Sequence, residues 1–184
     1  MALEQEIKLP FPTLEAARQA VLSAGGRLVL SRRLVDDQLF DTPDFALREA
    51  GTAVRVRRDG PRAALTWKGP AQPGPVKSRE ELETTIGDAD TVSRILSSLG
   101  YRASFRSQKF REDYTLDGAT VVIDETPFGV FLEIEASPEC IAQVAAALGR
   151  TSADYRLESY VSLWRRWCEA HGRPFGDMLF PIVP

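Results

Sequence analysis

The sequence predicts an α+β fold, an eight-stranded antiparallel β-barrel with helices packed on its outside. Most segments of the 184 residues alternate apolar and polar side chains with a period of two, which is typical of half-buried strands. Two Asp-Gly pairs stand where hairpins would turn, and about four segments carry the caps or glycine stops of helices. About eight strands can close into a small barrel, although periodicity alone does not separate a closed tunnel from an open sheet with one polar face.

Proline and glycine bound the elements of the first half of the chain. The first strand ends at Pro10 and Pro12, and Thr13 can cap a helix that stops before Gly25. The predicted order is a strand at 2–9, a helix at 14–24, a long or bent strand at 27–42, a helical turn at 44–51, two strands within 52–69 that turn at Asp59-Gly60, and a Pro/Gly-rich loop at 69–76 that could gate a cavity.

The second half repeats this alternation of strands and helices. The helix near residue 90 is expected to turn Ile95, Leu96 and Leu99 inward, and Ser137 and Pro138 suit the start of another helix. The predicted order is a strand at 78–86, a helix at 88–99, strands at 101–116 and 119–125 around Asp117-Gly118, a strand at 130–137, and helices at 138–148 and 155–170.

Domain organisation follows from the lack of any clear linker. We expect residues 1–172 to form a single domain and residues 173–184 to be a tail packed on it, since its apolar side chains would otherwise be exposed. These side chains are Phe175, Leu179, Phe180 and Ile182.

Composition excludes several classes of function. The net charge is −3 and no long basic run exists, so a general nucleic-acid surface is not indicated. No segment is apolar enough to span a membrane, and no leader-like start is present, so we expect a cytoplasmic protein. Cys140 and Cys168 form no zinc or disulfide pattern, and His171 is the single histidine. The chemistry must therefore come from carboxylates, lysines and arginines.

Several predicted strands carry charged side chains at every second position, and these contain three Glu-x-Glu pairs and two basic pairs. Residues two apart in a strand share a face, so such charges lie side by side opposite the apolar face. A single pair of this kind is typical of a solvated sheet, but a solvated face usually mixes charge signs. The sets are Glu4, Glu6 and Lys8; Arg55 and Arg57; Arg79, Glu81 and Glu83; Lys109 and Arg111; and Glu133 and Glu135.

If these faces point into a barrel, the interior must be a hydrated tunnel completed by ions and an anionic ligand, because burying so many unpaired charges is prohibitive. Clustered carboxylates suit Mg²⁺ or Mn²⁺, and arginine and lysine suit phosphate oxygens. A metal-bridged polyphosphate would satisfy both signs of charge.

The motifs resemble the CYTH superfamily, the triphosphate tunnel metalloenzymes, whose hallmark is an N-terminal ExExK strand. Here that strand is Glu4-Gln5-Glu6-Ile7-Lys8. The resemblance continues through FDTPDFALREAGTAVRVRR, TWKGP, SREELET, QKFREDY and VVIDETPFGVFLEIE to YRLESYVSLW, and so covers about residues 2 to 165.

The resemblance implies a role for each charged residue. Metal binding falls to Glu4, Glu6, Glu133 and Glu135, with Glu81, Glu83 and Asp124 as helpers, and Lys8 joins the catalytic set. Phosphate binding falls to Lys8, Arg55, Arg57, Lys68, Lys109 and Arg111, and Arg79 either joins them or pairs with a glutamate on its own face. Ser159 and Tyr160 are interpreted as capping and packing residues.

Three functions remain open on the sequence. The first is hydrolysis of a small-molecule triphosphate, namely inorganic triphosphate, thiamine triphosphate or a nucleotide, with a water as nucleophile. The second is cyclisation of ATP, as in the class IV adenylyl cyclases of the same superfamily. The third is a non-catalytic polyphosphate or nucleotide sensor, which would gain nothing from extra carboxylates. The organic moiety, the metal and the choice between monomer and homodimer stay open.

Overall fold

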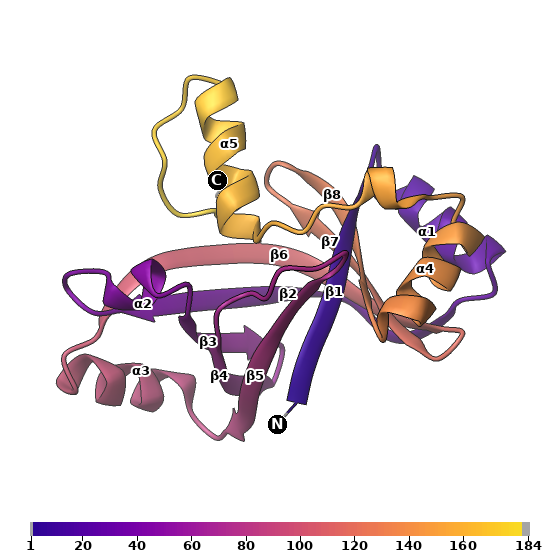
Figure 1. The fold of residues 1–184 in the computed structure, drawn as a ribbon. Helices are drawn as coiled ribbons and strands as arrows, with labels where there is room; N and C mark the ends of the chain where they lie inside the picture. The colour runs from indigo at the N-terminus through magenta and orange to yellow at the C-terminus, as the bar shows by residue number, and fades with distance from the viewer. Residues whose placement is uncertain (1, 182–184) are drawn as a thin grey trace.

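The computed structural model describes residues 2–181, which form one closed antiparallel barrel (Figure 1). The order around the barrel is β1, β5, β4, β3, β2, β6, β7 and β8, and β8 pairs with β1 to close it. The predicted fold class is therefore confirmed. The strands are β1 (Ala2–Phe11), β2 (Arg27–Asp41), β3 (Ala53–Asp59), β4 (Arg62–Lys68), β5 (Lys77–Ile86), β6 (Arg102–Leu116), β7 (Ala119–Thr126) and β8 (Gly129–Glu135).

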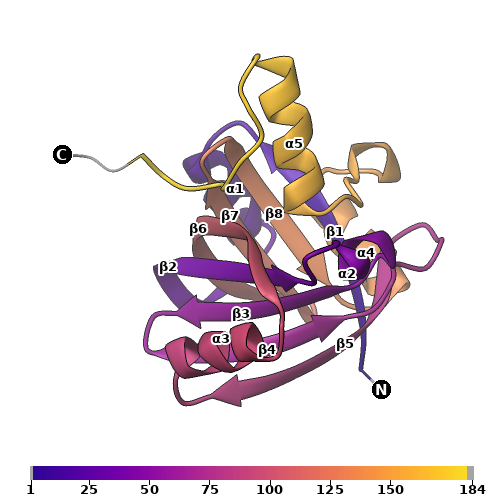
Figure 2. The same ribbon diagram turned by 90° about the vertical axis from the view of Figure 1, so that its left-hand side faces the viewer.

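The helices lie outside the barrel. Helices α1 and α4 cover the outer faces of β1, β7 and β8, and α3 lies against β3 and β4 (Figure 2). No helix within residues 2–181 is long and apolar enough to cross a membrane. The helices are α1 (Leu14–Ser23), α2 (Ala46–Glu49), α3 (Ala89–Ser98), α4 (Pro138–Ala147), α5 (Tyr160–Ala170) and the 3₁₀ turn η1 (Ser152–Asp154).

The main hydrophobic core lies between the barrel wall and α1 and α4, outside the barrel. Alternate side chains of β1, β7 and β8 point outward into it and are fully or almost fully buried. The strand residues are Ile7, Leu9, Val121, Ile123, Leu132 and Ile134, and the helix residues include Val21, Ile141 and Val144. Because the core is built on the outer surface, the barrel interior does not have to be apolar.

The last helix begins later than the sequence pattern predicted. We expected it from Tyr155, but α5 begins at Tyr160, where the Ser159 hydroxyl accepts the backbone N–H of Ser162. The preceding segment is extended because Arg156 exchanges two backbone hydrogen bonds with Lys8 of β1, at 3.0 and 2.8 Å. Pairing with the barrel edge of β1 therefore overrides the local helical pattern.

Helix α3 also packs through a different face from the one expected. Ala89, Val92 and Leu96 contact the barrel, whereas Ile95 and Leu99 are 51% and 70% exposed. Positions 89, 92 and 96 lie on one face of a helix, and the backbone N–H groups of Leu99 and Gly100 already cap the last turn. The prediction for Ile95 and Leu99 is wrong.

The segment after α5 returns along β6. Met178, which the sequence reading did not select, is 1% exposed and exchanges backbone hydrogen bonds with Arg106 and Gln108. Trp164 donates its indole N–H to the Gly176 carbonyl at 2.8 Å. The Phe175 ring stacks on Phe105 and the Phe180 ring packs on Phe110 at an interplanar angle of 42°, although Phe175 and Leu179 stay 39% and 36% exposed. Ile182 lies outside the described residues.

Candidate functional site

The barrel encloses a cavity of about 670 Å³. Its wall consists of the inward-facing side chains of the strands, which alternate with the outward-facing core residues. Every charged residue selected from the sequence lines this cavity except Asp124, which lies behind the wall with 0% exposure. The structure thus brings together Glu4, Glu6, Lys8, Arg55, Arg57, Lys68, Arg79, Glu81, Glu83, Lys109, Arg111, Glu133 and Glu135.

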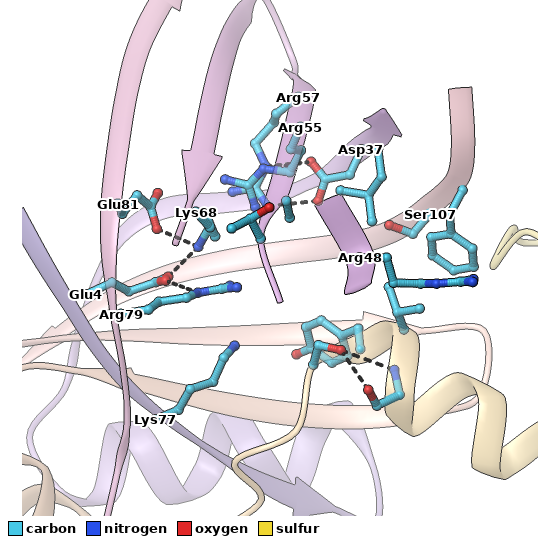
Figure 3. A pocket seen from close by; sticks show the side chains of 18 of the residues that line it. Glu4, Asp37, Arg48, Arg55, Arg57, Lys68, Lys77, Arg79, Glu81 and Ser107 are labelled. Carbon is cyan, nitrogen blue, oxygen red and sulfur yellow. Dashed lines mark hydrogen bonds and ion pairs between the residues drawn. The ribbon is translucent and has the colours of Figure 1, made fainter. Parts of the chain in front are cut away.

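Glu4 and Glu81 form one group of carboxylates with Lys68 between them (Figure 3). The Lys68 ammonium lies 2.6 Å from a Glu4 oxygen and 2.5 Å from a Glu81 oxygen. Arg79 donates to the other Glu4 oxygen at 3.1 Å, so in this structure Arg79 pairs with a glutamate. Burial, together with the neighbouring Glu4, raises the pKa of Glu81. Glu4 and Glu81 therefore share Lys68, and of the two only Glu4 has a second cation partner.

A second group lies deeper in the same wall and is more fully paired. Lys8, 2% exposed, lies 3.0 Å from Glu6 and 3.2 Å from Glu133, and Lys77 also contacts Glu6. Although burial alone would raise the pKa of Glu6, the charges of Lys8 and Lys77 hold it well below its usual range. Burial and the charge of Lys8 lower the pKa of Lys77 to about 8. Two lysines and two glutamates are therefore balanced in this group.

A third group surrounds Asp124. This carboxylate accepts a hydrogen bond from Lys109 at 2.9 Å, two from Arg111 at 2.7 and 2.6 Å, and one from the Tyr160 hydroxyl at 3.0 Å. Arg111 also reaches Glu133 at 2.7 Å. Burial and the charge of Arg111 lower the pKa of Lys109 to about 8. Asp124 is therefore buried beneath the side chains that line the cavity, and it fixes two of their cations in place.

The fourth group lies on β3, where Arg55 pairs with Glu83 at 3.3 Å but keeps one buried N–H without a partner. Arg57 makes two hydrogen bonds to Asp37, at 2.7 and 2.8 Å. The Nε of Arg55 is buried without a hydrogen-bond partner and lies 3.9 Å from Asp37. Burial and the charge of Arg57 lower the pKa of Arg55. An anion in the cavity would relieve this cost.

Glu135 lies among other carboxylates at the end of β8. Among the residues that the structure describes, no cation pairs with it. Partial withdrawal from solvent, followed by repulsion from Glu4, Glu6 and Glu81, raises its pKa to about 7. Glu83 is exposed and accepts hydrogen bonds from Thr66 and Arg55. This end of the cavity therefore carries uncompensated negative charge.

Three residues of this site escaped the sequence reading. Lys77 precedes Arg79 by two positions on β5, so its place on the inner face follows from the same alternation. Asp37 pairs in register with Arg57, which only the sheet topology reveals. Tyr160 was interpreted as a packing residue, but it donates a hydrogen bond to Asp124, and the ammonium groups of Lys8 and Lys109 lie 5.1 and 4.8 Å from its ring.

Comparison with known protein families identifies this arrangement. A profile of the CYTH domain matches residues 2–158, which is most of the chain. The chain belongs to the CYTH domain family.

Relatives of this CYTH chain carry two kinds of activity name. A Methanocaldococcus jannaschii protein named provisionally as an adenylate cyclase is 29% identical over 136 residues, 73% of this chain and 77% of that protein. The adenylate cyclase CyaB of Aeromonas hydrophila is 26% identical over 171 residues, 87% of each chain. A Bacillus subtilis protein named provisionally as a triphosphatase is 31% identical over 83 residues, 44% of this chain and 43% of that protein.

Solved structures share the fold of this CYTH chain. A Vibrio parahaemolyticus protein described provisionally as an adenylate cyclase superposes with a TM-score of 0.78 at 21% identity, covering 88% of this chain and 97% of its own. A Hippeastrum protein named provisionally as an adenylyl cyclase, and described as having a dominant triphosphatase activity, gives a TM-score of 0.67 at 19% identity, covering 94% and 97%. At these identities the likeness shows the fold.

The donor chemistry of the CYTH barrel fits a divalent cation. Carboxylate oxygens are the ligands that Mg²⁺ and Mn²⁺ prefer, and burial together with the neighbouring carboxylates raises the pKa of Glu135, which has no cation partner among the described residues. Within residues 2–181, however, no three His, Cys, Asp or Glu side chains are already arranged as a ligand set. Binding therefore requires some of these carboxylates to turn away from Lys68 and Arg79.

Proposed function

We propose that the chain is a divalent-metal-dependent phosphohydrolase that acts on triphosphate substrates inside its barrel. One observation carries the proposal: a single cavity holds both a buried arginine N–H without an acceptor and a carboxylate without a cation partner. Arg55 has a buried, unpaired Nε, while Glu135 has its pKa raised to about 7 beside other carboxylates. A triphosphate accompanied by a divalent cation supplies the missing acceptor and the missing positive charge at once.

The basic residues of the wall would bind and orient the phosphates. Arg55 and Arg57 come from β3 and Lys109 and Arg111 from β6, with β2 between these strands, and Lys8, Lys68 and Arg79 extend the same cationic lining. Arg111 and Lys109 are held by Asp124, so the substrate does not have to order them. Charge-assisted hydrogen bonds from these fixed groups would stabilise the negative charge that shifts between phosphate oxygens during transfer.

The carboxylates would hold the metal ion. We assign this role to Glu4, Glu6, Glu133 and Glu135, with Glu81 and Glu83 as helpers. Bound there, Mg²⁺ or Mn²⁺ would polarise a phosphoryl oxygen and lower the pKa of a water molecule. Asp124 is better suited to positioning Lys109 and Arg111, because its oxygens already accept four hydrogen bonds from three side chains behind the cavity wall.

Cyclisation of ATP is the second candidate. It is favoured by the relatives that cover 73% and 87% of this chain, because both bear adenylate cyclase names. In that reaction the ribose 3′-hydroxyl attacks the α-phosphate and pyrophosphate leaves. The same cations and carboxylates would serve either reaction, so the structure of the wall does not separate them.

Product analysis separates these functions. The purified protein is incubated with Mg²⁺ or Mn²⁺, and with EDTA as a control, in the presence of inorganic triphosphate, thiamine triphosphate or ATP. Orthophosphate release that requires metal supports the hydrolase, whereas cyclic AMP with pyrophosphate supports the cyclase. Absence of turnover with every substrate, combined with tight triphosphate binding, would contradict both and favour a binding module.

A further inference from the structure

One end of the cavity has a different chemistry from the charged wall. Figure 3 places Arg48 at the side of the cavity opposite Glu4 and Glu81, with Arg55 and Arg57 between them. Around Arg48 the lining comes from α2, β2, β6, α5 and the segment after α5, and much of it is apolar. We call this part the aromatic mouth; it consists of Leu39, Phe45, Arg48, Phe105, Val161, Arg165 and Phe175.

Phe45 is held in an unfavourable backbone conformation at this mouth. Its φ is 62°, in the left-handed region that a bulky side chain rarely adopts, and its side chain is 41% exposed. Asp41 fixes the turn by accepting the backbone N–H groups of Thr42, Leu47 and Arg48, at 2.8, 3.0 and 3.1 Å. A glycine or asparagine would fit this position better, so the fold retains a strained and partly exposed ring here.

Phe175 brings a second aromatic surface to the mouth. Its ring is parallel to that of Phe105, with an interplanar angle of 6° and centroids 5.7 Å apart. The chain on either side is anchored, because Gly176 accepts the Trp164 indole N–H and Met178 pairs with the backbone of β6. The returning segment therefore fixes a flat, partly exposed stack beside the cavity.

Two guanidinium groups complete the mouth. Arg48 lies over the Phe45 ring at 4.4 Å, and Arg165 lies over the Phe175 ring at 3.9 Å. Both arginines are exposed, and neither has a carboxylate partner among the side chains that the structure describes. Each therefore offers a planar surface and free N–H donors toward the same cavity.

We propose that the aromatic mouth binds the nucleobase of a nucleoside triphosphate whose phosphates lie along the charged wall. The inference rests on the proposed function for the triphosphate, and it selects a nucleotide over inorganic triphosphate, which has no group that could contact Phe45. A base stacks on aromatic rings and on guanidinium planes, and its ring nitrogens and carbonyl groups accept hydrogen bonds from arginine. The mouth supplies both kinds of contact and is continuous with the phosphate-binding wall.

The test compares ATP with inorganic triphosphate in the same variants. Phe45→Gly removes the ring and suits the left-handed backbone, whereas Phe45→Tyr keeps the ring. Phe11→Leu is the matched control, because Arg150 lies over the Phe11 ring at 4.6 Å but this pair does not line the cavity. We expect Phe45→Gly to lower the ratio of kcat/KM for ATP to that for triphosphate about tenfold, the size expected for lost base stacking. Phe45→Tyr and Phe11→Leu should leave the ratio within about twofold.

The outcomes distinguish this inference from the proposed function. An unchanged ratio in Phe45→Gly, or an equal fall with both substrates, would overturn the nucleobase site. Absence of metal-dependent turnover in the wild type would instead overturn the hydrolase. In that case, calorimetric titration of wild type and Phe45→Gly with ATP and with triphosphate still tests the nucleobase site, because only the affinity for ATP should fall in the variant.

Discussion

The two faces of β1 and β8 have opposite chemistry although they belong to the same strands. The outward face carries Ile7, Leu9, Leu132 and Ile134, all with 0% exposure beneath α1 and α4. The inward face carries Glu6, Lys8, Glu133 and Glu135, which line the cavity. The comparison teaches that this barrel places its hydrophobic core on the outside of its wall and reserves the inside for charge.

The two faces also contribute differently to stability. Burying an aliphatic side chain stabilises a fold by about 1.5–3 kcal/mol, so the outward face holds the strands together. Ion pairs within the cavity gain Coulomb energy but lose hydration, and their net contribution is small or unfavourable. Substitutions at successive positions of one strand should therefore alternate between effects on stability and effects on activity.

The largest effect is expected from the inner face of β1. Glu4→Gln removes a charge that the metal needs, and we expect kcat/KM for the hydrolysed triphosphate to fall about 1,000-fold, or ~4 kcal/mol. Lys68 keeps Glu81 as a partner, so the melting temperature should change little. Glu80→Gln, on the outer side of neighbouring β5, is the control and should keep full activity. Full activity in Glu4→Gln would remove Glu4 from the metal site.

The outer face should show the opposite result. Leu132→Ala leaves a cavity in the main core, and we expect a loss of about 3 kcal/mol in the free energy of unfolding. The neighbouring Glu133 keeps its partners, so kcat/KM measured well below the melting temperature should stay within about twofold. Urea unfolding and steady-state kinetics on one preparation check both halves. A large kinetic defect without destabilisation would break the separation of the two faces.

Arg55 sharpens the comparison because its buried Nε has no hydrogen-bond partner. Arg55→Met should raise KM about 30-fold, since it removes a charge-assisted hydrogen bond worth ~2 kcal/mol. The substrate-free protein should be as stable as the wild type or more stable, because burial and Arg57 disfavour the charge on Arg55. Arg58→Met, on the outer side of β3, is the kinetic control. A lower melting temperature with unchanged KM would assign Arg55 to structure.

Much of this organisation could be predicted from the sequence, because alternation fixes which side chains share a strand face. The charges of β1, β3, β5, β6 and β8 were placed correctly on one surface for this reason. Alternation does not say whether that surface faces water or a closed interior. The prediction that the sheet closes into a barrel came from the resemblance to the CYTH superfamily. The role of Asp124 also depended on pairing between strands, since its partners Lys109 and Arg111 lie on β6.

The aromatic mouth could not be predicted in this way. Phe45, Phe105 and Phe175 are far apart in sequence and share no period. They line one cavity because a left-handed residue turns one ring toward it and the chain after α5 folds back along β6. The predicted start of the last helix at Tyr155 was wrong for a related reason. The backbone pairing of Arg156 with Lys8, which delays the helix to Tyr160, is a tertiary contact that the local pattern does not contain.

The smallest effect concerns Glu135 and depends on pH. Its pKa in the folded protein is about 7, above the ordinary value of 4.5, so the folded state favours the protonated form. The stabilisation from this proton is complete below pH 4.5 and is lost as pH rises through 7. Glu135→Gln imitates the protonated carboxyl at every pH. The variant should therefore match the wild type near pH 4.5 and exceed it by about 1 kcal/mol at pH 8, after allowance for solvent screening.

Metal ions make this difference diagnostic. Denaturant unfolding at pH 8 is measured for the wild type and Glu135→Gln, without and with Mg²⁺ or Mn²⁺. If Glu135 helps to hold the cation, metal should stabilise the wild type more than the variant and so cancel the variant's advantage. Equal stabilisation of both proteins by metal would show that Glu135 does not bind the cation and is only repelled by Glu4, Glu6 and Glu81. The inner face of β8 would then contribute Glu133 alone to the metal site.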